Sequence, residues 1–90
     1  MSSNIICSYI DANIENISDV PFGDQTETIN LHHNKISRLL KGVFPTTLVN
    51  LDLSSNRLTT LSGVENLLNL KKLNLSANGI VDIKAIRYLR

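Results

Sequence analysis

The sequence has few of the residues that stabilise small domains or that carry chemistry. Its 90 residues contain no tryptophan, and aromatic residues make up only 4% of the chain. The net charge is +1 and the basic residues do not form a run, so no electrostatic field attracts nucleic acid or a membrane surface. No apolar segment is long enough to serve as a signal peptide or a bilayer span, so we expect no membrane insertion.

The cysteine content bears on the compartment. Cys7 is the single cysteine and cannot form a disulfide within the chain. The simplest explanation of a single cysteine is a reducing environment. We therefore expect a cytoplasmic location, with Cys7 buried in the core. Two glycosylation sequons, at Asn16 and Asn74, favour the alternative of an extracellular part of a truncated receptor.

A 22-residue repeat organises the chain. Asn34, Asn56 and Asn78 lie 22 residues apart, in the segments INLHHNKISRL, LDLSSNRLTTL and LNLSANGIVDI. Apolar residues stand five and three places before each asparagine and two and five places after it. One further step back reaches Ala12, with Cys7 and Tyr9 in the two preceding apolar positions, which indicates a degenerate first unit. The predicted units are about 1–25, 26–47, 48–69 and 70–90.

Each unit changes its period at the asparagine. Before it, alternation predicts a short strand that buries every second side chain. After it, apolar residues recur every third place, as at Leu58, Leu61 and Val64, which suits 3₁₀ or short helical turns. We expect Asn34, Asn56 and Asn78 to form a stacked row whose amides satisfy buried turns. At Asn78, the following Gly79 suits a tight turn with positive φ.

This pattern resembles that of the leucine-rich repeat family, L-x-x-L-x-L-x-x-N-x-L. The 22-residue spacing is similar to the class found in a regulatory subunit of type-1 protein phosphatase. The resemblance covers residues from about 5 to 89 and implies an α/β right-handed solenoid with a parallel concave sheet that binds protein. Because the chain ends where another strand would begin, we expect a fragment of a longer solenoid.

Side chains between the core positions of each strand should face the concave side. We predict a partner-binding surface made by Glu27, Asn30, His32, His33, Asn50, Asp52, Lys71, Lys72 and Asn74. Four strands about 4.8 Å apart and roughly 17 Å long give a face on the order of 300 Å². A standard interface takes about 800 Å² from each partner, so this chain alone should bind weakly.

Catalytic, metal and cofactor sites are not expected. His32 and His33, which should both face solvent, could approach Asp11 or Asp52, but no further ligand or spacing motif accompanies them. His32, Asp52 and Ser54 would be neighbours, yet an open sheet offers no water-excluding pocket for a triad. We therefore predict a non-enzymatic protein-interaction module. The alternative is an N-terminal structural or capping portion of a larger leucine-rich repeat receptor, kinase or scaffold.

Overall fold

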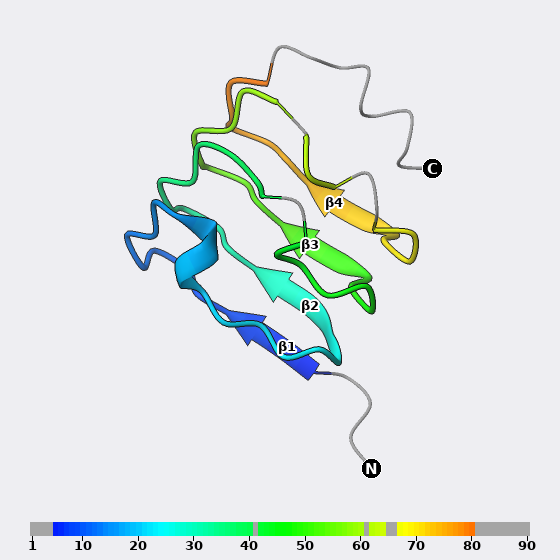
Figure 1. Ribbon diagram of the computed structural model, residues 1–90. Helices are drawn as coiled ribbons and strands as arrows, with labels where there is room; N and C mark the ends of the chain where they lie inside the picture. Colours follow the sequence, from blue (N-terminus) through cyan, green and yellow to red (C-terminus); the bar gives the residue numbers. More distant parts are fainter. Residues whose placement is uncertain (1–4, 41, 61, 65–66, 81–90) are drawn as a thin grey trace.

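Four short parallel strands form one sheet along the solenoid (Figure 1). The computed structural model describes residues 5–40, 42–60, 62–64 and 67–80. The strands follow the sequence in the order β1-β2-β3-β4, so each unit lies beside the next. Their bounds are Ile5–Ser8, Thr26–Asn30, Asn50–Asp52 and Lys72–Asn74. This arrangement confirms the predicted solenoid with a parallel sheet.

The sheet register keeps the sequence period. Thr28 aligns with Asn50, and Asn50 aligns with Lys72, at a constant offset of 22 residues. The same offset pairs Ile6 with Thr28, and a bulge between Ile5 and Ile6 shifts only the first residue of β1. Because parallel neighbours stay in phase, equivalent side chains from all four units form straight lines across the sheet.

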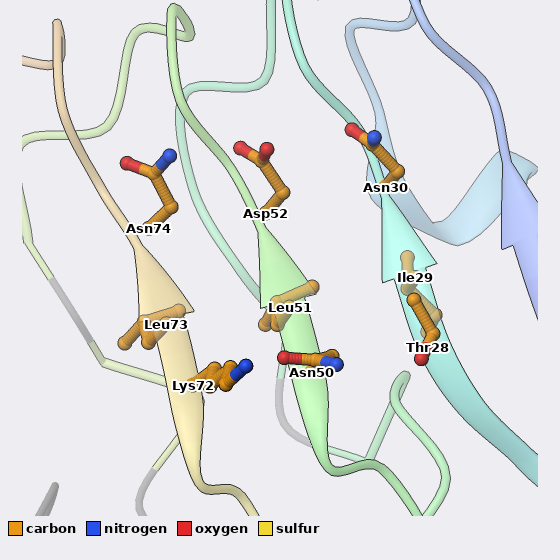
Figure 2. A pocket seen from close by; sticks show the side chains of 9 residues that line it. All are labelled: Thr28, Ile29, Asn30, Asn50, Leu51, Asp52, Lys72, Leu73 and Asn74. Atoms are coloured by element: carbon orange, nitrogen blue, oxygen red, sulfur yellow. The ribbon is translucent and has the colours of Figure 1, made fainter.

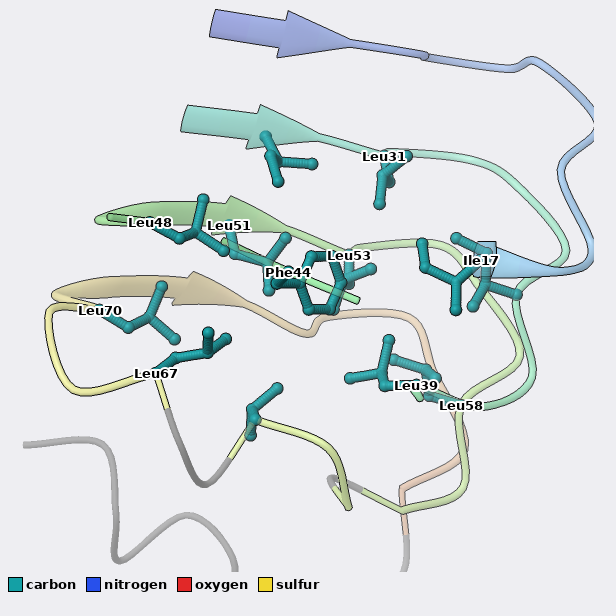
Figure 3. Close-up of a cluster of buried hydrophobic side chains, with 13 residues drawn as sticks. Ile17, Leu31, Leu39, Phe44, Leu48, Leu51, Leu53, Leu58, Leu67 and Leu70 are labelled. Atoms are coloured by element: carbon teal, nitrogen blue, oxygen red, sulfur yellow. The ribbon is translucent and has the colours of Figure 1, made fainter. Parts of the chain in front are cut away.

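The core is built from the repeated apolar positions. Ile29 of β2, Leu51 of β3, and Leu31 and Leu53 directly after these strands are at most 2% exposed. The alternating side chains therefore point inward as predicted, as Figure 3 shows for Leu31, Leu51 and Leu53. Thr26 stands where other units have leucine and is also fully buried. The cluster continues through residues of the return segments: Ile17, Ile36, Leu39, Phe44, Leu48, Leu58, Val64, Leu67 and Leu70.

The convex side has less helix than the three-residue period predicts. Among the described residues one 3₁₀ helix is present, η1 at Ile17–Asp19, where Asn16 caps the first turn by accepting a bond from the Ser18 backbone N–H. The later units have separate turns closed by a bond from the N–H of residue i+3 to the carbonyl of residue i, such as Leu67 N–H to Val64 O. In the second unit the three-residue spacing of apolar residues is interrupted, and Gly42 has φ +82°. Phe44 fills the core there, and the centroid of its ring lies 5.6 Å from that of Phe22.

The residue with positive φ in the turn after each strand lies immediately before the repeat asparagine, and in the last unit this is two residues before the predicted Gly79. His33, Ser55 and Ala77 each precede a repeat asparagine and have φ of 58–60°, and Asp11 has φ 52° at the same place in the first unit. The expectation of positive φ at Gly79 is wrong, because Ala77 makes the turn. Gly79 instead links its coil to the preceding one, because its N–H donates to Leu58 O at 2.9 Å.

The first strand lies at an edge of the sheet, and its burial reflects that position. Cys7 is half-buried rather than enclosed, with its Sγ 3.6 Å from Thr26 Oγ1, because β1 pairs on one side with β2. Within the described part of the chain, no helix is long and apolar enough to cross a membrane.

Candidate functional site: the concave face of the sheet

Three rows of polar side chains run across the repeats, and the innermost row is made by the repeat asparagines. We call Asn34, Asn56 and Asn78 the asparagine ladder. Asn56 Nδ2 donates to Leu31 O at 2.9 Å and to Leu53 O at 3.0 Å, and its Oδ1 accepts from Ile36 N–H at 3.1 Å. One amide therefore satisfies backbone groups of its own coil and of the coil before it.

The other two ladder residues repeat this pattern. Asn78 Nδ2 donates to Leu53 O at 2.8 Å, and its Oδ1 accepts from Leu58 N–H at 2.9 Å. Asn34 Oδ1 accepts from the N–H groups of both Ala12 and Ile14, each at 3.0 Å. The degenerate first unit thus has its turn satisfied from the second unit, which explains why Ala12 can replace an asparagine.

The exposed rows border a shallow hollow of about 340 Å³ on the concave face (Figure 2). Asn30, Asp52 and Asn74 stand in one row at the strand ends, and we call these three residues the Asx row. A second row, at the strand starts, contains Thr28, Asn50 and Lys72. The backbone between the two rows belongs to the core residues Ile29, Leu51 and Leu73.

Local hydrogen bonds orient the Asx row. Asn30 Oδ1 accepts from His32 N–H at 3.0 Å, and Asp52 Oδ1 accepts from Ser54 N–H at 2.9 Å. Asn74 Oδ1 makes the equivalent bond to Ser76 N–H at 3.1 Å. These are Asx turns, in which the side chain closes a ring onto the backbone two residues later. One end of each side chain is thus fixed, and the other end, an Nδ2 amide or the Oδ2 oxygen, remains for a partner.

The contacts among His32, Ser54 and Asp52 have the wrong order for a catalytic triad. The Ser54 hydroxyl lies 2.6 Å from Asp52 Oδ1 and donates its proton there. His32 Nδ1 lies 2.7 Å from Ser54 Oγ and therefore acts as the donor to it. A triad places the histidine between the carboxylate and the hydroxyl, so that the imidazole can remove the proton. Here the serine lies between them, which makes the cluster a structural hydrogen-bond chain.

The two histidines differ in their surroundings. His32 is half-buried and its Nδ1 is hydrogen-bonded to Ser54 Oγ, so the ring faces solvent in part. His33 lies in the turn after β2 and is exposed, with its Nδ1 3.3 Å from Asp11 Oδ1. In the described ranges, no group of three or more His, Cys, Asp or Glu side chains is close enough to hold a metal ion.

The remaining predicted residues lie at the margins of the hollow. Glu27 is half-buried near the start of β2, and its carbonyl accepts from Val49 N–H at 2.8 Å. Lys71 is exposed immediately before β4. The hollow therefore gathers Asn30, Asn50, Asp52, Lys72 and Asn74 of the predicted set, and the two histidines lie beyond the strand ends.

The predicted binding set leaves out three side chains on this face. Thr28 lines the hollow between β1 and β3. Ile6 and Ile10 are 64% and 49% exposed, although large aliphatic side chains usually avoid water. The 22-residue period places all three on the face, because it aligns Ile6 with Thr28 and Ile10 with His32.

Comparison with known proteins agrees with this architecture. Residues 46–88 match the model of a family described as "Leucine Rich repeats (2 copies)". No curated protein sequence matches the chain. Among solved structures, the chain is similar to an internalin (inlF) from Listeria monocytogenes str. 4b F2365, with a TM-score of 0.65 and 28% sequence identity.

The extent of that structural match is uneven. It covers 73% of this chain and 19% of the internalin chain, so the protein corresponds to about a fifth of its solved neighbour. The matched region includes more than the two repeats found by the family model. Together, the 22-residue period, the four-stranded parallel sheet and both comparisons agree with a leucine-rich repeat fold.

Proposed function

We propose that the chain is a non-catalytic module that binds another protein through the concave face. Leucine-rich repeat domains are in general protein-interaction modules. The observation that carries the proposal is the hollow between the Asx row and the line formed by Thr28, Asn50 and Lys72. Its side chains present hydrogen-bonding groups at a regular spacing and sit on strands rather than on mobile loops.

The pre-orientation of the Asx row supports recognition. Because Asn30 and Asn74 each have Oδ1 fixed by a backbone N–H, each Nδ2 offers a donor in a defined direction. Between them, Asp52 has Oδ1 fixed and Oδ2 available as a charged acceptor. A partner therefore meets donor, acceptor and donor groups in sequence, with little side-chain entropy left to lose on binding.

The open shape of the site argues against an enzyme. The hollow lies on a sheet face and does not enclose a substrate, and the Ser54 hydroxyl donates to the Asp52 carboxylate rather than to the His32 imidazole. General acid–base and nucleophilic mechanisms need oriented groups in a site that excludes water.

We propose that the repeats belong to the 22-residue class similar to the type-1 phosphatase regulatory subunit, which is supported by the constant register offset.

A selection from a random peptide display library tests the proposal. The library is panned on the whole chain, and binders are then measured against two variants, Asn50→Arg in the hollow and Thr59→Arg outside it. We expect Asn50→Arg to weaken the binders about tenfold or more, since a bulky cation would fill the hollow. Thr59 is exposed and belongs to the same unit, so Thr59→Arg controls for added charge.

The urea unfolding midpoint of both variants shows whether either substitution disturbs the fold. Binders that lose affinity for Thr59→Arg but not for Asn50→Arg would place recognition on the convex side and refute the proposal. Failure of the library to give any binder sensitive to Asn50→Arg would have the same meaning.

A further inference from the structure

One register line across the sheet changes its chemistry in a single direction. Ile6, Thr28, Asn50 and Lys72 are aligned partners on the four consecutive strands, and we call them the polarity line. Along it the side chain changes from aliphatic, to hydroxyl, to amide, to ammonium. The neighbouring line through the Asx row has no such gradient, because polar residues occupy every one of its positions.

Both ends of the polarity line are accessible. Ile6 is 64% exposed on β1, and Lys72 is exposed on β4. Within the described part of the chain, the Lys72 ammonium forms no ion pair. Asp52, on the neighbouring strand, uses one carboxylate oxygen for its bond to Ser54 N–H. An apolar side chain and a cation that both face solvent on one continuous surface are complementary to a partner with an apolar group and an anion.

Resting on the proposed function, we propose that the concave face binds an extended peptide segment with an apolar residue at one end and an acidic residue at the other. The apolar side chain contacts Ile6, and Ile10, two residues beyond the end of β1, widens that contact. The carboxylate pairs with the Lys72 ammonium. Between them, a polar side chain or a backbone carbonyl bonds with Thr28 and Asn50.

The spacing of the strands fixes the spacing of the motif. Three steps of about 4.8 Å separate β1 from β4, which gives about 14 Å between the ends of the line. An extended chain advances about 3.3 Å per residue, so residues i and i+4 span nearly that distance and point to the same side. The motif therefore has an apolar residue, a polar residue two places on, and an aspartate or glutamate four places on, in either chain direction.

Synthetic peptides test this inference by NMR titration of the whole chain. The first peptide carries leucine, threonine and glutamate at alternate positions, separated by glycines, and a second carries them in reverse order. Matched peptides replace the glutamate with lysine or the leucine with serine. We expect millimolar affinity for at least one order, with shifts at the Ile6 methyl groups and around Lys72. The lysine peptide should bind about two- to fivefold more weakly, the scale of an exposed ion pair.

Variants of the chain make the test sharper. Lys72→Glu should reverse the preference, so that the lysine peptide becomes the tighter ligand, whereas Arg57→Glu, at an exposed cation away from the hollow, should leave it unchanged. Ile6→Ser should weaken the leucine peptide about threefold or more. Leu68→Ser is its matched control, because Leu68 is 89% exposed in the turn before β4.

Several outcomes would overturn the inference. They are equal binding of the glutamate and lysine peptides, shifts confined to other surfaces, and no binding of either order. A change in self-association with Ile6→Ser, seen by sedimentation, would show that a second copy covers β1 instead. If these peptides fail while library binders remain sensitive to Asn50→Arg, the polarity motif is wrong and the concave interaction module stands.

Discussion

Two sets of short polar side chains in the same three repeat units have opposite roles. The asparagine ladder and the Asx row are four residues apart in every unit, and both repeat at 22-residue intervals. Ladder residues use both ends of the amide on backbone groups of two coils, as Asn56 does. The Asx row uses one end within its own turn and leaves the other at the surface. Short side chains of similar size therefore stabilise the fold in one row and are available for recognition in the other.

Removal of a ladder amide should have the largest effect on stability. Asn56→Ala leaves the buried Ile36 N–H without its acceptor and removes two donors from backbone carbonyls. We expect a loss of about 2–4 kcal/mol in the free energy of unfolding. Urea denaturation followed by circular dichroism measures it. Asn50→Ala, a concave substitution in the same unit, serves as the control and should change stability by less than about 0.5 kcal/mol.

The turn that positions each ladder amide can be perturbed without touching the amide. Ala77 precedes Asn78 with φ 59° and is exposed. Ala77→Val should cost about 1–2 kcal/mol, because a β-branched residue is poorly accommodated at positive φ. Ala77→Gly should be neutral or slightly stabilising in the same urea measurement. Equal stability of the valine and glycine variants would refute the role of this turn.

Substitution in the Asx row separates its local role from its surface role. Asp52→Ala removes the acceptor of Ser54 N–H, and Ser54 is 4% exposed, so we expect a loss of about 1 kcal/mol. Asp52→Asn retains an acceptor oxygen and should fold with nearly unchanged stability. The comparison uses thermal and urea unfolding of the two variants. A loss as large for Asp52→Asn would mean that charge, rather than the turn, stabilises this position.

The smallest effect is expected at the end of the same row. Asn74→Ala removes the equivalent bond to Ser76 N–H, but Ser76 is exposed and water can replace the acceptor. We expect a change below about 0.5 kcal/mol in urea unfolding. Its difference from Asp52→Ala measures how far burial determines the cost of an Asx turn. A loss that matches Asp52→Ala would show that exposure does not decide this cost.

The sequence specified the repeated features of the fold and was less informative about single contacts. The 22-residue period located the core positions around Leu51 and Leu53, the parallel strands and the alignment of surface lines. It could not show that the Ser54 hydroxyl turns toward Asp52 rather than His32, because that depends on side-chain rotation within one turn. Nor could it place positive φ at Ala77 instead of Gly79, since local glycine preference gave way to the geometry of the repeated turn.

The concave face shows the same limit. Periodicity places Asn50, Lys72 and also Ile6 on it, because all three fall between the core positions. The 64% exposure of the Ile6 side chain is a property of the structure that periodicity does not give. Its role is therefore apparent only when position and solvent contact are considered together.

Each ladder asparagine bonds to the coil before it, and this constrains where a repeat unit can gain or lose residues. Asn78 bonds Leu53 and Leu58, so a residue inserted between Leu73 and Asn78 would separate the amide from both. An insertion in the return segment, such as beside the exposed Ser62, leaves that geometry unchanged. Small insertions should thus be tolerated on the convex side, and the strand-to-asparagine stretch should gain or lose residues only as whole units of 22.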